Sequence, residues 1–238
     1  MHLLGKLFIG KLATDYLGCS DKALKWMYKY SGKLSQSKII KNGIDTSKFN
    51  YNPTIHEEVR NRIKINNQIV IGHVGRFMPV KNHKFLIDIF YEVKKIEPDA
   101  LLLLVGDGEL LGTIKEYSCS LGIQDEIRFL GVRDDINKLM QAMDGFVMPS
   151  LYEGLPVVLV EAQASGLPVF CSDTISLMSK LTDNYHILSL KDKPADWAQK
   201  IIKEIRKFKR ETTTAQIIKA GFDISTTTKL LSDLYAGK

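Results

Sequence analysis

Short apolar strands alternate with helix-length segments through the middle of this chain, and that alternation constrains its fold more than any other feature. Helical segments are expected at 84–95, 109–121 and 136–143 and after Pro156. Strands that are apolar throughout and separated by helices are typical of a parallel sheet covered by helices on both faces. The sequence therefore predicts a doubly wound, Rossmann-like α/β domain over residues 55–220. Its expected strands are 69–74, 100–105, 127–130, 145–148, 168–171 and 186–190.

Composition sets outer bounds on the class of protein. The chain has 238 residues and 45% hydrophobic content, enough to bury a sizeable core. No run approaches 18 apolar residues, so no membrane-spanning helix is expected. The first residues lack the charged start, apolar centre and cleavage site of a secretion signal. Cys19, Cys119 and Cys171 are far apart and join no Cys/His cluster, which predicts reduced, buried thiols of a cytoplasmic protein.

The net charge of +6 is concentrated in one segment. Residues 200–210, K-I-I-K-E-I-R-K-F-K-R, combine basic residues with apolar ones at helical spacing. Such a helix could lie on an anionic membrane surface, but an ordinary surface helix with its apolar stripe on the core is favoured. No motif interleaves aromatic residues with these cations, so nucleic-acid binding is not expected.

Two carboxylates, Glu153 and Glu161, are separated by eight positions around an expected helix start at Pro156. Glu153 is expected in the loop before the helix and Glu161 on its second turn. The backbone N–H groups near Gly154 and Leu155 have no intrahelical acceptor and lie at the positive end of the helix dipole. This combination suits a ligand that carries both phosphate and hydroxyl groups. An ordinary helix start whose acids complement the dipole would show the same spacing.

Two cations follow the first strand of the domain, in G-H-V-G-R-F-M-P-V-K-N-H. Gly72 and Gly75 allow close backbone approach, and Arg76 and Lys81 stand in the loop. A guanidinium fork and an ammonium group are the usual pair for binding a diphosphate. Ligands of doubly wound sheets bind at the carboxyl ends of the strands, where the strand order reverses. That placement favours a diphosphate site over two cations exposed in solvent.

Two further patterns are interpreted as local structure. V-G-D-G-E-L-L-G at 105–112 has the spacing GxGxxxG, and no acidic residue closes a second strand about twenty positions on, so a tight strand-to-helix turn is favoured over a nicotinamide site. Asp107 with Glu109, and Asp134 with Asp135, lack the additional ligand that a metal site needs. Both pairs are interpreted as turn and helix-start residues.

The two ends of the chain differ from its middle. Residues 15–19 are a short strand candidate, Ser20 is placed to cap a helix over 21–30, and K-N-G-I-D-T at 41–46 is a turn-rich link. These residues are too few to close a core of their own. Apolar residues at helical spacing mark one helix face near the start, at Leu3, Leu4, Leu7, Phe8 and Leu12, and one in the last helix, at Leu230, Leu231, Leu234 and Tyr235.

Taken in order, the motifs resemble those of the family 4 (group 1) glycosyltransferases with the GT-B fold. The matching motifs are G-R-F-x-x-x-K-N, L-L-x-V-G-D-G, I-R-F-L-G and P-S-x-x-E-G-L-P-x-V-x-x-E-A-x-A-x-G-x-P-V. The resemblance runs from about Ser20 to the end of the chain. It implies a remnant of an N-terminal Rossmann-like domain at 1–40, an interdomain linker at 41–54, a nucleotide-sugar-binding domain at 55–220, and a C-terminal helix at 221–238 that packs back on the N-terminal domain.

The resemblance also implies a role for each matching residue. Arg76 and Lys81 would neutralise the diphosphate of a nucleotide-sugar donor, Glu161 would hold both ribose hydroxyls, and Glu153 would contact the donor sugar near the reacting carbon. The family transfers with retention and uses no bound metal or cofactor. Catalysis by Glu153, Arg76 and Lys81 would then rest on electrostatic support of the departing diphosphate and on positioning. The remaining implied donor contacts are backbone groups, at Gly75, at Gly154, Leu155 and Pro156, and, for the base, at Gly131, Val132 and Arg133.

In this family the N-terminal domain supplies a glycine-rich loop, a histidine on the catalytic side and the acceptor pocket. Residues 1–38 match only its last helix, strand and helix, so roughly 130–150 residues would be missing, judged from the usual size of such a domain. None of the five histidines (His2, His56, His73, His83 and His186) matches the family histidine, and His73 is expected to be a packed residue at a strand end. We therefore expect a donor-binding chain that is inactive alone, as a fragment or as half of a split enzyme whose partner chain carries the rest.

The leading hypothesis is a retaining hexosyltransferase that uses a nucleotide-diphosphate sugar and a saccharide or lipid-linked acceptor in cell-surface polysaccharide or glycolipid synthesis. Its expected place is the cytoplasm, with peripheral contact to the inner face of the membrane. Two alternatives stay open at this point. One is a catalytically silent nucleotide-binding or partner-pairing module. The other is a sugar-nucleotide epimerase, which E-G-L-P-x-V-x-x-E together with G-R-x-x-x-x-K disfavours.

Overall fold

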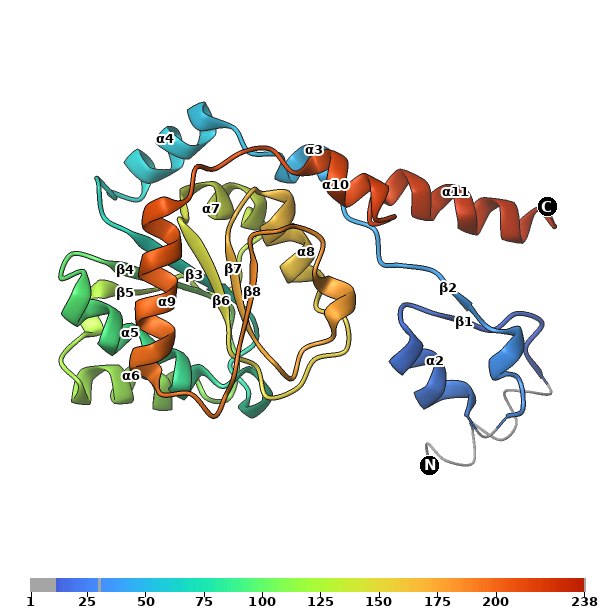
Figure 1. The fold of residues 1–238 in the computed structure, drawn as a ribbon, viewed down its shortest axis with the longest axis horizontal. Helices are drawn as coiled ribbons and strands as arrows, with labels where there is room; N and C mark the ends of the chain where they lie inside the picture. Colours follow the sequence, from blue (N-terminus) through green and yellow to red (C-terminus); the bar gives the residue numbers. More distant parts are fainter. Residues whose placement is uncertain (1–11, 30, 238) are drawn as a thin grey trace.

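A six-stranded parallel sheet forms the centre of the computed structural model, which describes residues 12–29 and 31–237 (Figure 1). The strand order is β5-β4-β3-β6-β7-β8, so the chain first builds outward from β3 on one side and then on the other. This confirms the predicted doubly wound α/β fold. The strands are β3 (Val70–Val74), β4 (Leu101–Val105), β5 (Ile127–Phe129), β6 (Gly145–Met148), β7 (Val169–Ser172) and β8 (Tyr185–Leu188).

Helices bury both faces of the sheet, which explains why its strands are apolar throughout. Leu102 and Leu104 pack with Phe90 of α5 (His83–Ile96) and Trp197 of α9 (Pro194–Lys207) on one face, where α6 (Leu111–Ser120) also lies. Leu103 packs on the opposite face, against α7 (Ile136–Ala142) and α8 (Val157–Ala164). Successive strand residues point to opposite faces, so each face receives its own set of side chains.

The predicted elements are found within one or two residues of their expected bounds in the sheet domain, with two differences. Pro156 precedes the first residue of α8 instead of occupying it. The basic helix begins earlier than its charge run, because Pro194 and the capping residue Asp196 start α9 there. Ile201 and Ile202 of this helix are buried and α9 packs on α5, which confirms that the apolar stripe faces the core.

The prediction of buried thiols is correct only for Cys171. Cys119 is exposed and Cys19 is partly exposed. Cys119 lies near the end of α6, a helix that buries only Ile114 and Ser118 and leaves most of its surface in solvent. Burial raises the pKa of the Cys171 thiol to about 11.

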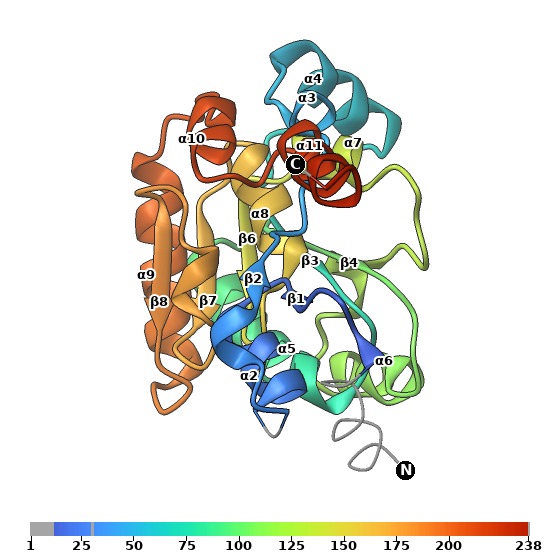
Figure 2. The same ribbon diagram turned by 90° about the vertical axis from the view of Figure 1, so that its right-hand side faces the viewer.

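Residues 12–40 form a small unit beside the sheet domain, on the side toward which α11 (Ile224–Tyr235) extends (Figures 1 and 2). It contains the parallel strands β1 (Leu17–Gly18) and β2 (Lys38–Ile39) and the helix α2 (Asp21–Tyr28). Ser20 caps α2 by accepting a hydrogen bond from the Ala23 N–H, as predicted. The helix face expected over Leu3, Leu4, Leu7 and Phe8 lies outside the described residues, as does Tyr30.

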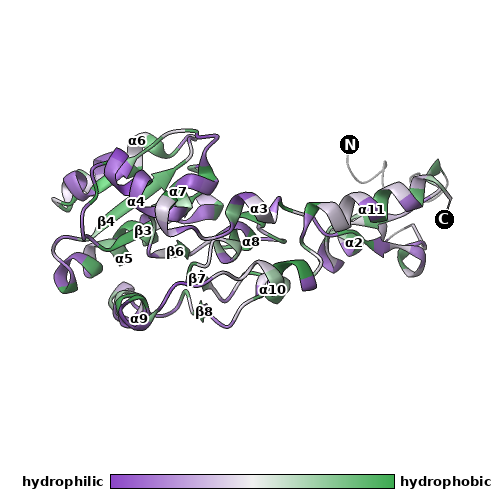
Figure 3. Ribbon diagram, turned by 90° about the horizontal axis from the view of Figure 1, so that it is seen from above, coloured by the Kyte–Doolittle hydropathy of each residue, from purple (hydrophilic) through white to green (hydrophobic). Residues whose placement is uncertain are grey.

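The turn-rich link is tied to the end of the chain before α11 begins. The Ile44 N–H donates to Phe222 O at 2.8 Å, and Thr46 Oγ1 donates to Asp223 Oδ1 at 2.6 Å. Short helices α3 (Thr46–Phe49), α4 (Pro53–Arg62) and α10 (Thr214–Lys219) complete this region. Hydrophobic residues recur along α11 where it extends past the sheet (Figure 3), and Leu230 and Tyr235 are exposed there. In the described part of the chain, no helix has both the length and the apolarity to cross a membrane.

Arg210 joins the carboxyl ends of α7 and α8, where the last helical carbonyls lack intrahelical donors. Its guanidinium also stacks over the Tyr51 ring at 4.3 Å. One side chain therefore satisfies acceptors from both helices that cover this face of the sheet. It donates to four carbonyl oxygens at 2.8–2.9 Å, those of Met140, Gln141, Met143 and Ser165.

Arg210→Ala should lower the free energy of unfolding by about 3 kcal/mol, because it leaves several inward-facing carbonyls without their charged donor. Chemical denaturation followed by circular dichroism measures this change. Arg206→Ala is the matched control, since Arg206 is an exposed arginine paired with Glu97 and exposed pairs contribute little. Equal stability of the two variants would contradict the structural role of Arg210.

Candidate functional site

The reversal of strand order brings two loops together at the carboxyl ends of β3 and β6. The Leu151 N–H donates to Val80 O at 2.8 Å, and Asn82 Nδ2 donates to Pro149 O at 3.1 Å. Asn82 has a left-handed backbone (φ 55°, ψ 43°), which lets the 3-10 turn η2 (Pro79–Lys81) end and α5 begin in the next residue. The loop with the predicted phosphate cations and the loop with the predicted acids therefore lie side by side.

Lys81 and Glu153 form an ion pair across these two loops. Lys81 Nζ lies 2.7 Å from Glu153 Oε1, and the two side chains are only 16% and 17% exposed. The contact is short, but its angles are outside hydrogen-bond geometry, and Oε1 has no hydrogen-bond partner in the described part of the chain. Sequence reasoning placed both residues in one site and did not predict that they would pair.

Arg76 lines a cavity of about 470 Å³ at the carboxyl ends of β3 and β4. Its side chain is exposed and forms no ion pair with any described residue. Gly75, Val132 and Arg133 also line the cavity, and Val132 is 80% exposed at its rim. The structure thus brings the predicted diphosphate cation and the predicted base-binding segment to one cavity. Gly131, the first residue of that segment, is not among the lining residues, and neither are Lys81, Glu153 and Glu161.

Glycines allow the loops around this cavity to pack closely. Gly106 has φ +136°, and a Cβ atom added to it would lie 2.1 Å from Gly75 O. The Gly106 N–H donates to Gly131 O at 2.8 Å, and the Phe77 N–H donates to Asp107 O at 2.9 Å. These contacts confirm the interpretation of V-G-D-G as a tight turn. They also join the loops that follow β3, β4 and β5 into one wall.

Glu161 lies on the second turn of α8, as predicted, and is partly buried. Burial raises the pKa of its carboxyl group, and no described cation is paired with it. Gly154 faces open space, because an added Cβ would meet no atom within 4 Å. The Pro156 side chain is buried and that of Leu155 packs against the cluster around Val160, so these two residues offer the site their backbone only.

Asp135 is the N-cap residue of α7, and its side chain binds two arginines. Arg133 donates two hydrogen bonds of 2.8 Å to its carboxylate, and Arg62 donates a third of 3.1 Å. The hydrogen bond from Arg133 holds the pKa of Asp135 below its usual value. The interpretation of Asp135 as a helix-start residue is confirmed by its position directly before α7, where its carbonyl accepts from the Leu139 N–H at 3.0 Å, although its side chain makes no cap hydrogen bond. Asp107 is a turn residue as predicted and accepts from the Gly108 N–H at 2.8 Å.

Two buried histidines underlie the Lys81–Glu153 pair. His73 is fully buried at the end of β3, which confirms the expectation of a packed residue, and its Nδ1 donates to Val147 O at 2.8 Å. His83 begins α5, stacks on Phe77 at 4.1 Å between ring centroids, and meets the His73 ring at 4.8 Å. Burial lowers the pKa of His73 to about 4 and that of His83 further still. His83 had no predicted role, and its place directly after Lys81-Asn82 was the only signal.

Buried polar atoms that make no hydrogen bond gather at this position. In the described ranges, the side-chain nitrogen or oxygen atoms that are buried without a hydrogen bond belong to His73, His83, Ser150 and Glu153. His73 is the last but one residue of β3, His83 begins α5, and Ser150 and Glu153 lie in the loop after β6, so all four are near the carboxyl ends of β3 and β6. Buried polar groups are normally paired in folded proteins, so unpaired ones indicate a functional site or a bound water. No cluster of three or more potential metal ligands (His, Cys, Asp or Glu) occurs among the residues described.

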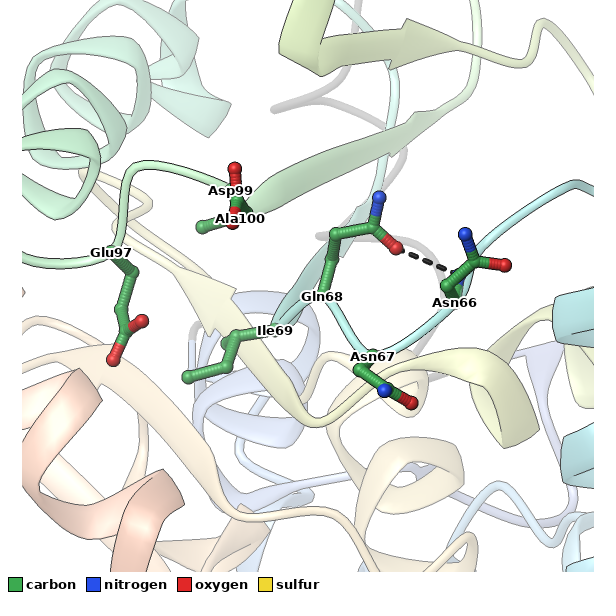
Figure 4. Close-up of a pocket in the computed structure, with 7 residues that line it drawn as sticks. All are labelled: Asn66, Asn67, Gln68, Ile69, Glu97, Asp99 and Ala100. Atoms are coloured by element: carbon green, nitrogen blue, oxygen red, sulfur yellow. Dashed lines mark hydrogen bonds between the residues drawn. The ribbon is translucent and has the colours of Figure 1, made fainter.

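Another cavity, of about 320 Å³, lies at the opposite edge of the sheet (Figure 4). It is bounded by residues 66–69, before β3, and by Glu97, Asp99 and Ala100, before β4. Arg206 already binds Glu97. Ligands of open α/β sheets bind at the carboxyl ends of the strands, so we assign the site to the cavity beside Arg76.

Sequence comparison gives one family match and a set of relatives. The sequence model of the family described as "Glycosyl transferases group 1" matches residues 55–221. A putative glycosyltransferase, EpsF of Bacillus subtilis (strain 168), is 36% identical over 230 residues, which cover 94% of this chain and 59% of EpsF. An Escherichia coli enzyme, UDP-Gal:alpha-D-GlcNAc-diphosphoundecaprenol alpha-1,3-galactosyltransferase, is 34% identical over 178 residues, 71% of this chain and 45% of the enzyme.

A solved structure shares the fold. HepE of Anabaena, in complex with UDP-glucose, superimposes with a TM-score of 0.80 over 99% of this chain and 67% of HepE, at 24% identity. This similarity extends over residues 12–40 as well as over the sheet domain. The chain spans about three fifths of the length of EpsF and less than half that of the galactosyltransferase.

His73 and His83 should stay neutral well below pH 6, because burial holds the pKa of each ring below the ordinary histidine value of 6.5. The unfolded chain binds protons that the folded chain excludes, so this contribution to stability is fully present above pH 6.5 and falls as the pH drops from 6.5 toward 4. The expected slope is about 1.4 kcal/mol per pH unit for each histidine.

Imidazole NMR and denaturation between pH 7 and pH 5 measure the two effects. His83→Leu should reduce the slope of unfolding free energy against pH, because one of the two excluded protonations is removed. Titration of either ring near pH 6.5 in the folded protein would contradict the assignment.

Proposed function

The chain belongs to the group 1 glycosyl transferases, and we propose that its site binds the nucleoside diphosphate part of a nucleotide-sugar donor. One observation carries this proposal: Arg76, without an ion-pair partner in the described chain, lines a cavity that also contains Val132 and Arg133. A cavity lined by a free guanidinium and an exposed apolar side chain suits a diphosphate joined to a base. Lys81, Glu153 and Glu161 lie on the neighbouring loop and helix.

Each residue has a chemical task in this proposal. Arg76 binds the diphosphate through a planar fork that matches phosphate oxygens, and Lys81 adds a point charge from the β3–α5 loop. Glu161 holds the ribose hydroxyls, since a carboxylate with no cationic partner has acceptor sites for both. Glu153 contacts hydroxyls of the donor sugar. Backbone groups at Gly75 and Gly131, and at Gly154, Leu155 and Pro156, line the donor, as the family resemblance implies.

The proposed reaction breaks the bond between the anomeric carbon and the diphosphate. Negative charge grows on the leaving oxygen, and Arg76 and Lys81 stabilise it in a site that the fold has already arranged. We assign the chain to family 4 and propose that the sugar is transferred with retention of configuration. The cations that the departing diphosphate requires are side chains of this chain, and no metal or organic cofactor enters the proposal.

The proposed acceptor is a saccharide or a lipid-linked saccharide, and the proposed process is cell-surface polysaccharide or glycolipid synthesis. The Escherichia coli relative supports this class, because its name states a diphosphoundecaprenol-linked acceptor. We further propose that such an acceptor is met at the inner face of the cell membrane. A partner chain or further residues would supply the acceptor pocket, so the 238 residues alone should bind a donor without transferring its sugar.

Arg76→Ala and Glu161→Ala should each weaken binding of UDP or GDP, whichever the unaltered chain prefers. Loss of a charge-assisted hydrogen bond corresponds to about 1.5–3 kcal/mol, or roughly tenfold or more in the dissociation constant. Isothermal titration calorimetry measures this change. Arg206→Ala on α9 and Glu116→Ala on α6 are matched controls, because both side chains are exposed and absent from the cavity lining. Unchanged affinity in both site variants would refute the assignment.

A further inference from the structure

We infer that the Lys81–Glu153 ion pair makes this site discriminate a sugar-bearing donor from the bare nucleoside diphosphate that transfer leaves behind. The inference rests on the proposed function, because it assumes that the site takes a nucleotide sugar. It assigns Glu153 a second role beside sugar contact. In the ligand-free chain Glu153 is paired with Lys81, the cation that a diphosphate needs.

The pair is a built feature of the fold. Lys81 ends η2, directly before left-handed Asn82, whose side chain is bonded to Pro149 O. The backbone of Glu153 forms a parallel bridge with Ile175, which fixes the other loop. Both side chains are more than four-fifths buried. A contact held from both sides in this way persists in the ligand-free chain more than a pair of exposed, flexible side chains would.

Lys81 has no other anionic partner among the residues described. The charge of Lys81 acts on the nearby rings of His73 and His83. Both rings are neutral because burial disfavours their charged forms. The stem of Lys81 packs beside the Arg76 loop: a Cβ added to Gly75 would lie 3.3 Å from Lys81 Cε and 3.0 Å from His73 Nε2. The ammonium group is therefore next to the proposed diphosphate site but neutralised by Glu153.

A bare nucleoside diphosphate meets this arrangement at a disadvantage. To bind the phosphate, the Lys81 ammonium group must either break its ion pair with Glu153 or contact the carboxylate and the phosphate at once. The Glu153 carboxylate then lies close to phosphate oxygens of the same charge. Glu153 gains nothing in return, since Oε1 is already buried without a hydrogen bond and no sugar is present to donate one. The free energy needed to separate Lys81 from Glu153 therefore reduces the binding free energy of the bare nucleoside diphosphate.

A complete donor compensates for the same separation. Its sugar carries hydroxyl groups, and each one that donates to Glu153 gives the buried carboxylate a partner to replace Lys81. Lys81 is then free to bind the diphosphate. The pair therefore opposes the product more than it opposes the donor, and the difference depends on Glu153 carrying a negative charge.

The test is calorimetric binding of UDP and of GDP to the full chain and to Glu153→Gln, which keeps the shape of the side chain and removes its charge. The variant should bind the preferred nucleotide about fivefold more tightly or better, within the usual range of coupling between two ligands of one site. Glu109→Gln is the matched control. It removes an exposed carboxylate from the next loop along the sheet edge, and its affinity should change less than about twofold because exposed charges are screened.

The outcomes separate this inference from the proposed function. If the unaltered chain binds a nucleotide and Glu153→Gln binds it equally or more weakly, the inference is wrong and the donor site stands. If neither protein binds UDP or GDP, the proposed function itself is wrong.

A double-mutant cycle keeps the test decisive if Glu153→Gln alone loosens the fold. Lys81→Gln should cost more nucleotide affinity in the Glu153→Gln background than in the unaltered chain, because only there is the ammonium released from its partner. Equal costs in both backgrounds would overturn the inference.

Discussion

The parallel pairing of β3 with β6 is the constraint on which the site depends. These strands are far apart in sequence but directly hydrogen-bonded, with Gly72 opposite Phe146. Gly72 is required there, since an added Cβ would lie 2.0 Å from Met143 Sδ. Because both strands end at the same edge, the loops that follow them must meet, and the hydrogen bonds from Leu151 to Val80 and from Asn82 to Pro149 fix how they meet. The Lys81–Glu153 pair is a consequence of that geometry.

Burial then sets the charge of the site. His73 and His83 are held neutral beneath the loops, so they add no cation to the proposed diphosphate site and no competing charge to Lys81. Arg133 is bound to Asp135, which leaves Arg76 as the cavity-lining guanidinium without an ion pair in the described residues. Of Arg76 and Lys81, the two predicted diphosphate cations, the described chain thus leaves Arg76 without an ion pair and neutralises Lys81 through Glu153. Pairing, not the number of basic residues, determines what the ligand-free site offers to a phosphate group.

The sequence predicts the sheet because its signal is local: a run such as 101–105 is apolar at every position and can be read without knowing its neighbours. The same local reasoning placed Glu161 on the second turn of α8 and Arg76 after β3. It missed the Lys81–Glu153 and Arg62–Asp135 pairs, because each joins segments about 70 residues apart and depends on loop geometry that no periodicity records. It also missed that Cys119 is exposed, since hydrophobic character alone does not say which face of α6 meets solvent. The local sequence pattern thus predicts helices and strands, whereas ion pairs between loops depend on the order of the strands in the sheet.

The small unit at residues 12–40 lies next to the loop after β6. Lys22 of α2 lies 5.6 Å from the centre of the Tyr152 ring, so this unit stands beside the loop that carries Glu153. A sugar held by Glu153 would therefore lie at the junction between the unit and the sheet domain, while the diphosphate would lie toward Arg76. In many enzymes product release limits turnover, and tight binding of substrate and product alike does not speed the chemical step. If Glu153 pairs with Lys81 again once the sugar has been transferred, the affinity for the nucleoside diphosphate product would fall. Product release would then be faster.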